Sequence, residues 1–171
     1  RNIHSTDSAY PLWVADMDGD GDLDIITGHY AYTGIWWYKN NGESDPSWSR
    51  ESVFSYHNPI ESVKSLSAAD IDGDGHMDIA TVTSEYGNSY DKVAWYRNVV
   101  ADNGNEIYFY ERSLAENEHR YNDVAAVDMD GDGDIDLVST SDNYDNNIRW
   151  YENDGTTTPS WTTRNISSTH N

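Results

Sequence analysis

The chain repeats one acidic nonapeptide three times: DMDGDGDLD at residues 16–24, DIDGDGHMD at residues 70–78 and DMDGDGDID at residues 128–136. Aspartate stands at positions 1, 3, 5 and 9 of every copy, and glycine stands at positions 4 and 6. Glycine permits backbone conformations that a side chain would forbid, so the segment can turn tightly and gather its carboxylates. The nonapeptide therefore predicts three oxygen cages for a cation.

Calcium suits such a cage, because it takes about six to eight oxygen ligands in flexible geometry, whereas magnesium demands a strict octahedron. Position 7 varies between aspartate and histidine, so we expect a backbone carbonyl ligand there. The predicted side-chain ligands are Asp16, Asp18, Asp20 and Asp24, then Asp70, Asp72, Asp74 and Asp78, and finally Asp128, Asp130, Asp132 and Asp136. The predicted carbonyl ligands are Asp22, His76 and Asp134, which makes three Ca2+ sites.

Two other interpretations of the nonapeptide are weaker. An EF-hand needs an acidic twelfth residue, where this chain has Thr27, Thr81 and Ser139. A turn that only keeps a hairpin soluble has no reason to gather four or five carboxylates in nine residues. Such carboxylates repel one another unless a cation lies between them.

The composition restricts both partners and compartment. The 171 residues include 31 acidic and 10 basic side chains, which gives a formal charge of −21. This charge argues against nucleic-acid partners and against insertion into anionic membranes. The chain has no cysteine, so calcium is the expected staple in place of disulfides. Extracellular calcium is concentrated enough to fill even weak loops, and we expect an extracellular or cell-surface protein. We also expect a processed or trimmed product, because residue 1 is arginine.

Strand-forming segments recur with the nonapeptide. The copies begin 54 and 58 residues apart, a spacing typical of propeller blades and other repeat arrays. One apolar stretch precedes each copy, another follows it, and two more strand-like segments come before the next copy. Four antiparallel strands per period describe a propeller blade, and we place the periods at about residues 12–54, 64–114 and 122–166.

The third strand of each period carries the motif that we expect to fill the core. It reads IWWY, VAWY or IRWY, and it is followed by a turn at Asn40, Asn98 or Asn153. Alternation with a period of two predicts one buried face formed by Ile35 and Trp37, Val93 and Trp95, and Ile148 and Trp150.

Together, the acidic loops and the Trp-Tyr-x-Asn strands resemble the FG-GAP/VCBS repeats of integrin-alpha-type β-propellers over nearly the whole chain. The resemblance implies Ca2+ in the loop between the first two strands of each blade, and adhesion, carbohydrate-active or surface-structural roles. The predicted fold class is all-β: a β-propeller-type repeat with three four-stranded antiparallel blades in one domain, residues 1–171.

One extra terminal strand is predicted at residues 1–6, because their sequence RNIHST returns as RNISST at residues 164–169. Closed rings have about four to eight blades, so three blades need completion. We expect the extra strand to pair with other copies of the protein, giving a ring or a filament. The alternative is that the chain is a window of a longer repeat polypeptide.

A second candidate surface for ligand binding lies at the opposite end of the blades, where the loops between the second and third strands are rich in tyrosine. The residues of this potential ligand face are Tyr30, Tyr32, Tyr86, Tyr90 and Tyr144. Flat rings beside amides suit sugars, so a glycan-binding, lectin-like module or a non-catalytic part of a polysaccharide-active enzyme is the alternative function. Ordinary packing at the blade edge also explains these loops. Asn165 begins the single N-glycosylation sequon.

Nothing in the sequence predicts an enzyme. Any pair drawn from 31 acidic residues is uninformative about glycoside hydrolysis, and the clustered ones are assigned to metal. The six histidines occupy unrelated places in the repeat, as expected of solvated surface histidines. The sequence therefore predicts a non-catalytic, calcium-binding module for structure, assembly or adhesion.

Overall fold

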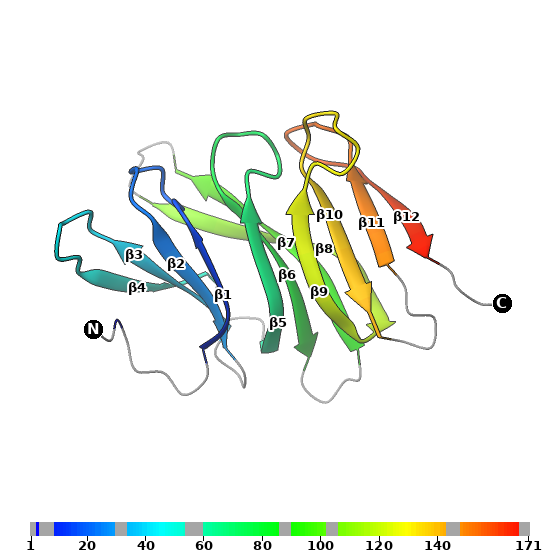
Figure 1. Ribbon diagram of the computed structural model, residues 1–171, viewed down its shortest axis with the longest axis horizontal. Helices are drawn as coiled ribbons and strands as arrows, with labels where there is room; N and C mark the ends of the chain where they lie inside the picture. Colours follow the sequence, from blue (N-terminus) through cyan, green and yellow to red (C-terminus); the bar gives the residue numbers. More distant parts are fainter. Residues whose placement is uncertain are drawn as a thin grey trace.

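The computed structural model describes residues 3, 9–29, 34–53, 60–85, 90–101, 106–142 and 148–167, and these residues form three separate β-sheets (Figure 1). The first sheet contains β1 (Ala9–Ala15), β2 (Asp24–His29), β3 (Ile35–Asn40) and β4 (Trp48–Ser52). The second contains β5 (Ile60–Ala69), β6 (Asp78–Glu85), β7 (Tyr90–Val100) and β8 (Ile107–His119). The third contains β9 (Tyr121–Val127), β10 (Asp136–Ser141), β11 (Ile148–Asn153) and β12 (Trp161–Ser167).

Each sheet is an antiparallel meander, because its strands lie side by side in the order in which they occur in the chain. The third sheet follows the same pattern. The predicted fold class is thus confirmed: three four-stranded antiparallel sheets of the propeller-blade type. The sheets stand in a row and do not close into a ring in the part of the chain that the structure describes (Figure 1).

The middle sheet departs from the predicted strand ends. Strands β3 and β11 end at Asn40 and Asn153 as expected, but β7 continues past Asn98 to Val100. The extension pairs Val100 with Ile107 at the start of β8. Apolar side chains stabilise this longer hairpin, because Ile107 packs against the core between the first two sheets.

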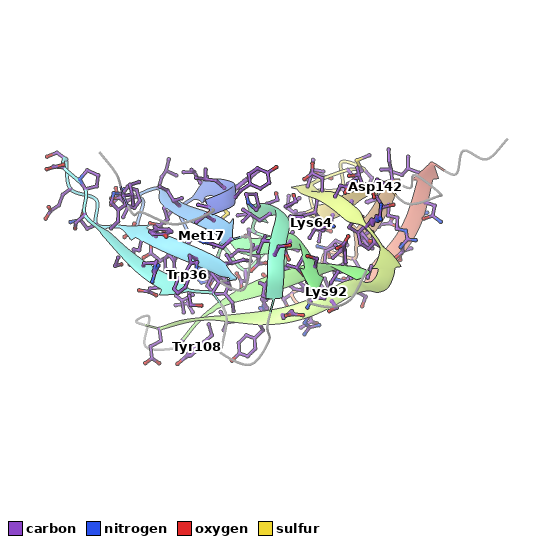
Figure 2. All side chains as sticks on the ribbon, turned by 90° about the horizontal axis from the view of Figure 1, so that it is seen from below. Met17, Trp36, Lys64, Lys92, Tyr108 and Asp142 are labelled. Atoms are coloured by element: carbon purple, nitrogen blue, oxygen red, sulfur yellow. The ribbon has the colours of Figure 1, made fainter. Side chains whose placement is uncertain are left out.

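The hydrophobic core lies between the sheets. One cluster joins the first and second sheets, and it includes Met17, Trp37 and Leu66 among its buried side chains. A second cluster joins the second and third sheets around Trp95 and Tyr151. Figure 2 shows the side chains gathered along the stacked sheets, with Met17 labelled. Adjacent blades therefore bury their facing surfaces against each other, as repeat architectures require.

The predicted core face is confirmed in two sheets and fails in the third. Ile35, Trp37, Val93 and Trp95 are buried, but Ile148 is exposed and Trp150 is only half-buried. The prediction was wrong for the third sheet because no following sheet covers it in the described chain. The expectation of solvated histidines is also wrong for His29, which is buried in β2.

Several predictions fall on residues that the structure does not describe. These are the extra strand at residues 1–6, of which only Ile3 is described, and the ligand-face residues Tyr30, Tyr32, Tyr86 and Tyr144. Tyr90 begins β7. Among the described residues, no helix has the length and apolar character needed to cross a membrane.

Candidate metal centres

The three acidic loops occupy equivalent places in the fold. They connect β1 to β2, β5 to β6, and β9 to β10, and they lie along the same edge of the row of sheets (Figure 1). The loop glycines all have positive φ, as the turn prediction requires: Gly19 and Gly21, Gly73 and Gly75, and Gly131 and Gly133. Each glycine thus stands where an ordinary side chain would strain the backbone.

The first aspartate of each loop organises the turn. In the first loop, Asp16 accepts hydrogen bonds from the backbone N–H groups of Gly19 at 2.8 Å and Gly21 at 2.9 Å. In the third loop, Asp128 accepts the equivalent bonds at 2.7 Å and 3.1 Å. These bonds curl the backbone around the carboxylate, so the nonapeptide positions its own acidic groups.

Three carboxylates converge in each loop, with one oxygen from each lying within 4.8 Å of the others. The clusters are Asp16, Asp18 and Asp24; Asp70, Asp72 and Asp78; and Asp128, Asp130 and Asp132. The predicted ligands Asp20 and Asp74 fall outside the first two clusters, and Asp136 falls outside the third. The structure therefore gathers nine of the twelve predicted side-chain ligands in three groups that could hold a metal ion.

The residues at positions 5 and 7 interact with each other. Asp22 donates its backbone N–H to Asp20 at 3.0 Å. The same bond joins His76 to Asp74 at 3.0 Å, and Asp134 to Asp132 at 2.9 Å. The shared contact explains why position 7 tolerates histidine, because its backbone, and not its side chain, takes part in the turn.

The ninth aspartate has a structural role that the sequence did not reveal. Asp24 is fully buried, and it accepts hydrogen bonds from the indole N–H of Trp37 at 2.8 Å and the backbone N–H of Asn40 at 2.8 Å. Asp78 accepts the equivalent bond from Asn98 at 2.7 Å. Asp136 does so from Asn153 at 2.8 Å. This carboxylate therefore fastens each acidic loop to the third strand of its own blade.

Burial and mutual repulsion disfavour the charged form of several loop carboxylates. Burial raises the pKa of Asp78 to about 7, against backbone hydrogen bonds from Asn98 and Ile71 that favour the charged form. Burial also raises the pKa of Asp24. It raises the pKa of Asp72 as well, where the charge of Asp74 adds to the effect. A bound cation would relieve both costs at once.

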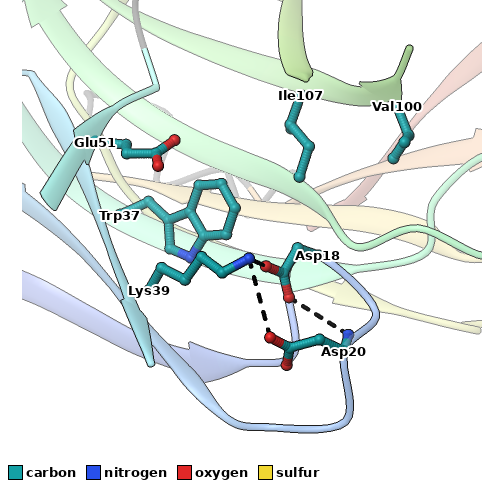
Figure 3. Close-up of a pocket in the computed structure, with 7 residues that line it drawn as sticks. All are labelled: Asp18, Asp20, Trp37, Lys39, Glu51, Val100 and Ile107. Atoms are coloured by element: carbon teal, nitrogen blue, oxygen red, sulfur yellow. Dashed lines mark hydrogen bonds and ion pairs between the residues drawn. The ribbon is translucent and has the colours of Figure 1, made fainter. Parts of the chain in front are cut away.

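Two loops receive a basic side chain from the third strand of the same blade. Lys39 forms an ion pair with Asp18 and lies 3.9 Å from Asp20 (Figure 3). Arg97 likewise pairs with Asp72, and its Nη2 atom lies 3.3 Å from Asp74. Both basic residues occupy the variable position of the Trp-Tyr-x-Asn motif, and sequence reasoning missed their role.

The third loop has no basic side chain at this position of the motif. Its residue at the equivalent position is Glu152. Loss of solvent contact raises the pKa of Asp130, and the negative charges of Asp132, Asp136 and Glu152 add to the effect. Glu152 accepts a hydrogen bond from Arg164 Nε at 2.6 Å. The three loops therefore share a backbone design but differ in the charge beside them.

The arrangement fits Ca2+ chemically. All the gathered groups are carboxylates, which are the hard oxygen ligands that calcium prefers. In the second loop, the Oδ1 atom of Asp70 is buried and accepts no hydrogen bond from the residues that the structure describes. An oxygen in that position is costly unless a cation or a donor reaches it.

The two other sites predicted from the sequence are the glycosylation sequon at Asn165 and the tyrosine-rich ligand face. Asn165 lies on β12 with its side chain exposed, opposite Arg149 of β11. Glycan binding by the tyrosine-rich loops stays a prediction, because four of its five tyrosines lie outside the described residues. Within the described residues, the acidic loops are the places where three or more metal-ligating side chains converge.

Comparison with known proteins addresses the repeat directly. A family model described as an FG-GAP-like repeat matches residues 16–81 and 128–171, which together cover more than half of the chain. The chain belongs to the FG-GAP-like repeat family. The matched segments contain all three acidic loops of this FG-GAP-like protein. A search of curated proteins gave no match.

Family membership agrees with the sequence-based resemblance at the level of the repeat. It indicates a β-rich module of the extracellular type that is generally not an enzyme. The three sheets of the FG-GAP-like protein are consistent with that assignment, since each sheet contains one acidic loop between its first two strands.

Proposed function

We propose that the protein is an extracellular, non-catalytic module that binds three Ca2+ ions and serves structure, assembly or adhesion. The observation that carries this proposal is the convergence of three carboxylates at the same place in each of three blades. Chance clustering of acidic groups would not favour the same turn, the same glycines and the same hydrogen bonds three times.

Calcium would offset two negative charges of a loop and tie its two ends together. In the first loop, Asp16 and Asp18 lie near the start, whereas Asp24 begins β2 and is bonded to β3. A cation shared by these residues would join the turn to the blade. Metal binding and folding would then be coupled, so calcium would stabilise the protein.

The charge of the chain supports an extracellular setting. Three Ca2+ ions would bring the formal charge from −21 to −15, which reduces self-repulsion without removing it. Calcium outside cells is abundant enough to keep modest sites filled. The absence of cysteine leaves metal as the available cross-link.

Isothermal titration calorimetry on the chelator-treated protein tests the proposal. We expect three Ca2+ per chain, and an increase in unfolding free energy of about 3 kcal/mol for each filled site when free calcium is about a hundred times the dissociation constant. Asp130→Asn should reduce the stoichiometry to two, because it removes a charge from the third cluster. Glu43→Gln is the matched control, since this exposed carboxylate lies in the β3–β4 turn. No binding heat and no stabilisation at millimolar calcium would refute the proposal.

A further inference from the structure

The two interfaces inside the chain show how one blade receives the next. The second residue of the first acidic loop, Met17, is 1% exposed because it packs in the core shared with the second sheet. Ile71 of the second loop is 2% exposed and packs against the third sheet in the same way. Met129 of the third loop is 48% exposed. Within the described chain, Met129 therefore lacks the apolar cover that Met17 and Ile71 have.

The rest of the same face follows this pattern. Ile35 and Val93, which start the core segment of the third strands, are both fully buried, but the equivalent Ile148 is 37% exposed. After β4, Val53 is buried, whereas its counterpart Ile166 on β12 is exposed. The outer face of the third sheet, formed by Met129, Ile148 and Ile166, therefore has the chemistry of an interface. We call it the leading face.

The first sheet exposes the opposite half of the same interface. Leu66 of β5 and Val124 of β9 are each 4% exposed because the preceding blade covers them, but the equivalent Leu12 of β1 is 59% exposed. Leu23 is exposed as well, although the residues at its position in the other loops, Met77 and Ile135, pack against the two cores. The surface formed by Leu12, Val14 and Leu23 is the trailing face.

An equivalent hydrogen bond crosses each of the two internal interfaces. The side-chain amide of Asn98 donates to the backbone carbonyl of Met17 at 2.9 Å, across the first interface. Asn153 donates to the carbonyl of Ile71 at 2.8 Å, across the second. Asn40 stands at the same position of the first blade, and among the described residues its amide donates to Leu23 within that blade.

We propose that the leading face of one copy docks on the trailing face of a second copy, repeating the two interfaces inside the chain. Met129 then enters the first blade of the neighbour, and its carbonyl accepts a hydrogen bond from the neighbour's Asn40. This inference rests on the assembly role in the proposed function and assigns that role to blade faces, in place of pairing by residues 1–6. Association is head to tail, so each copy uses two different surfaces.

A second copy is the occupant that the two faces fit. Their residues match those that the same chain already packs together twice, so the complementary shapes are present in one sequence. Two copies supply six blades, which lies within the range of about four to eight that closes a ring. We therefore expect a closed dimer. Its formation works against a formal charge of −21 per chain, so calcium and salt should favour it.

Sedimentation velocity on the 171-residue chain tests this docking. We expect Leu12→Glu and Met129→Glu each to weaken self-association by about tenfold or more, because the carboxylate would be buried against apolar groups. Both side chains are exposed in one copy, so folding should be retained. Tyr110→Glu is the control, since this exposed tyrosine lies on β8 away from both faces. Mixing the two face variants should restore a heterodimer, because each keeps the partner face that the other has lost.

Disulfide trapping gives an independent readout in a chain without cysteine. At the second internal interface, the hydroxyl of Ser67 lies 3.3 Å from the backbone nitrogen of Ala126. The equivalent positions between copies are Ala125 and Val14. We expect Ala125→Cys mixed with Val14→Cys to form a heterodimeric disulfide at a rate well above that of either variant alone.

The outcomes separate this inference from the calcium proposal. A monomer at all concentrations in saturating calcium would overturn the docking even if calorimetry finds three ions. The docking would also be overturned if a chain lacking residues 1–6 loses the dimer while Met129→Glu keeps it. Longer oligomers that disappear with either face variant would support the same contact without ring closure.

Discussion

Replacing Asn98 by alanine should destabilise the protein far more than the same change at Asn40. Asn98 is fully buried, and its amide donates to the carbonyls of Met17 at 2.9 Å and Met77 at 3.0 Å. These acceptors belong to two different blades. Alanine removes both bonds at once and leaves the two carbonyls without their donor.

The cost follows from the burial of those carbonyls. A buried polar group that loses its partner costs about 1–3 kcal/mol, so two groups cost about 2–6 kcal/mol, and we expect a total in the lower half of that range, about 3 kcal/mol. Asn40→Ala removes the bond to Leu23 at 3.2 Å and the bond that its Oδ1 accepts from Gly42 at 3.1 Å. Both bonds are exposed to water, which replaces the lost partners, so the cost should be about 1 kcal/mol. Asn153→Ala should resemble Asn98→Ala, because its amide spans the second interface.

Urea unfolding followed by tryptophan fluorescence measures the difference. All variants should be compared at one saturating calcium concentration and at a protein concentration low enough to keep single copies. A loss of about 3 kcal/mol corresponds to a decrease in melting temperature of about 6–12 °C for a chain of this size. Equal losses for Asn98→Ala and Asn40→Ala would refute the reasoning, because burial between blades is what distinguishes them.

Three further predictions follow from other contacts. Gly28→Ala should destabilise the protein by about 2 kcal/mol in urea unfolding, because a Cβ atom there would lie 2.4 Å from the Cβ of Val63 in the next blade; a wild-type midpoint would contradict this. Lys39→Gln should raise the calorimetric calcium affinity of the first loop by about fivefold, since the ammonium group competes with the metal; unchanged or weaker binding would show that the lysine does not compete. Lys64→Met should leave the buried Asp91 without its partner at 2.7 Å. Burial already raises the pKa of Asp91 above its ordinary 3.8, so its carboxyl is protonated more readily in the folded than in the unfolded state. The loss of stability should therefore be small below about pH 4, where Asp91 carries little charge, and should grow as the pH rises; a pH-independent loss, measured by thermal unfolding, would exclude this cause.

The repeat itself could be predicted because its information is local. Nine residues contain the glycines with positive φ and the aspartate whose bonds define the turn. Alternation of apolar residues then predicted strands, and the period predicted three blades. What failed at Ile148 was the assumption that every blade is alike, since burial depends on whether a further blade follows.

Other features could not be predicted because they join distant residues. Lys39 and Arg97 reach the acidic loops only because the third strand lies beside the second, and nothing in their own neighbourhood indicates a carboxylate partner. The role of Asp24 as a fastener depends on Trp37 and Asn40 in another strand. Register between strands, set by tertiary packing, decides these contacts.

The sequence alone determined the acidic turns, the all-β repeat and the number of blades, because each depends on interactions within a few residues or within one hairpin. Only the tertiary structure decided which side chains accompany the metal loops and which blade faces stay open. The physical reason is separation along the chain: the bond from Asn98 to Met17 spans 81 residues, and no local pattern encodes a contact of that range. The exposed Met129 became meaningful only beside its buried counterparts.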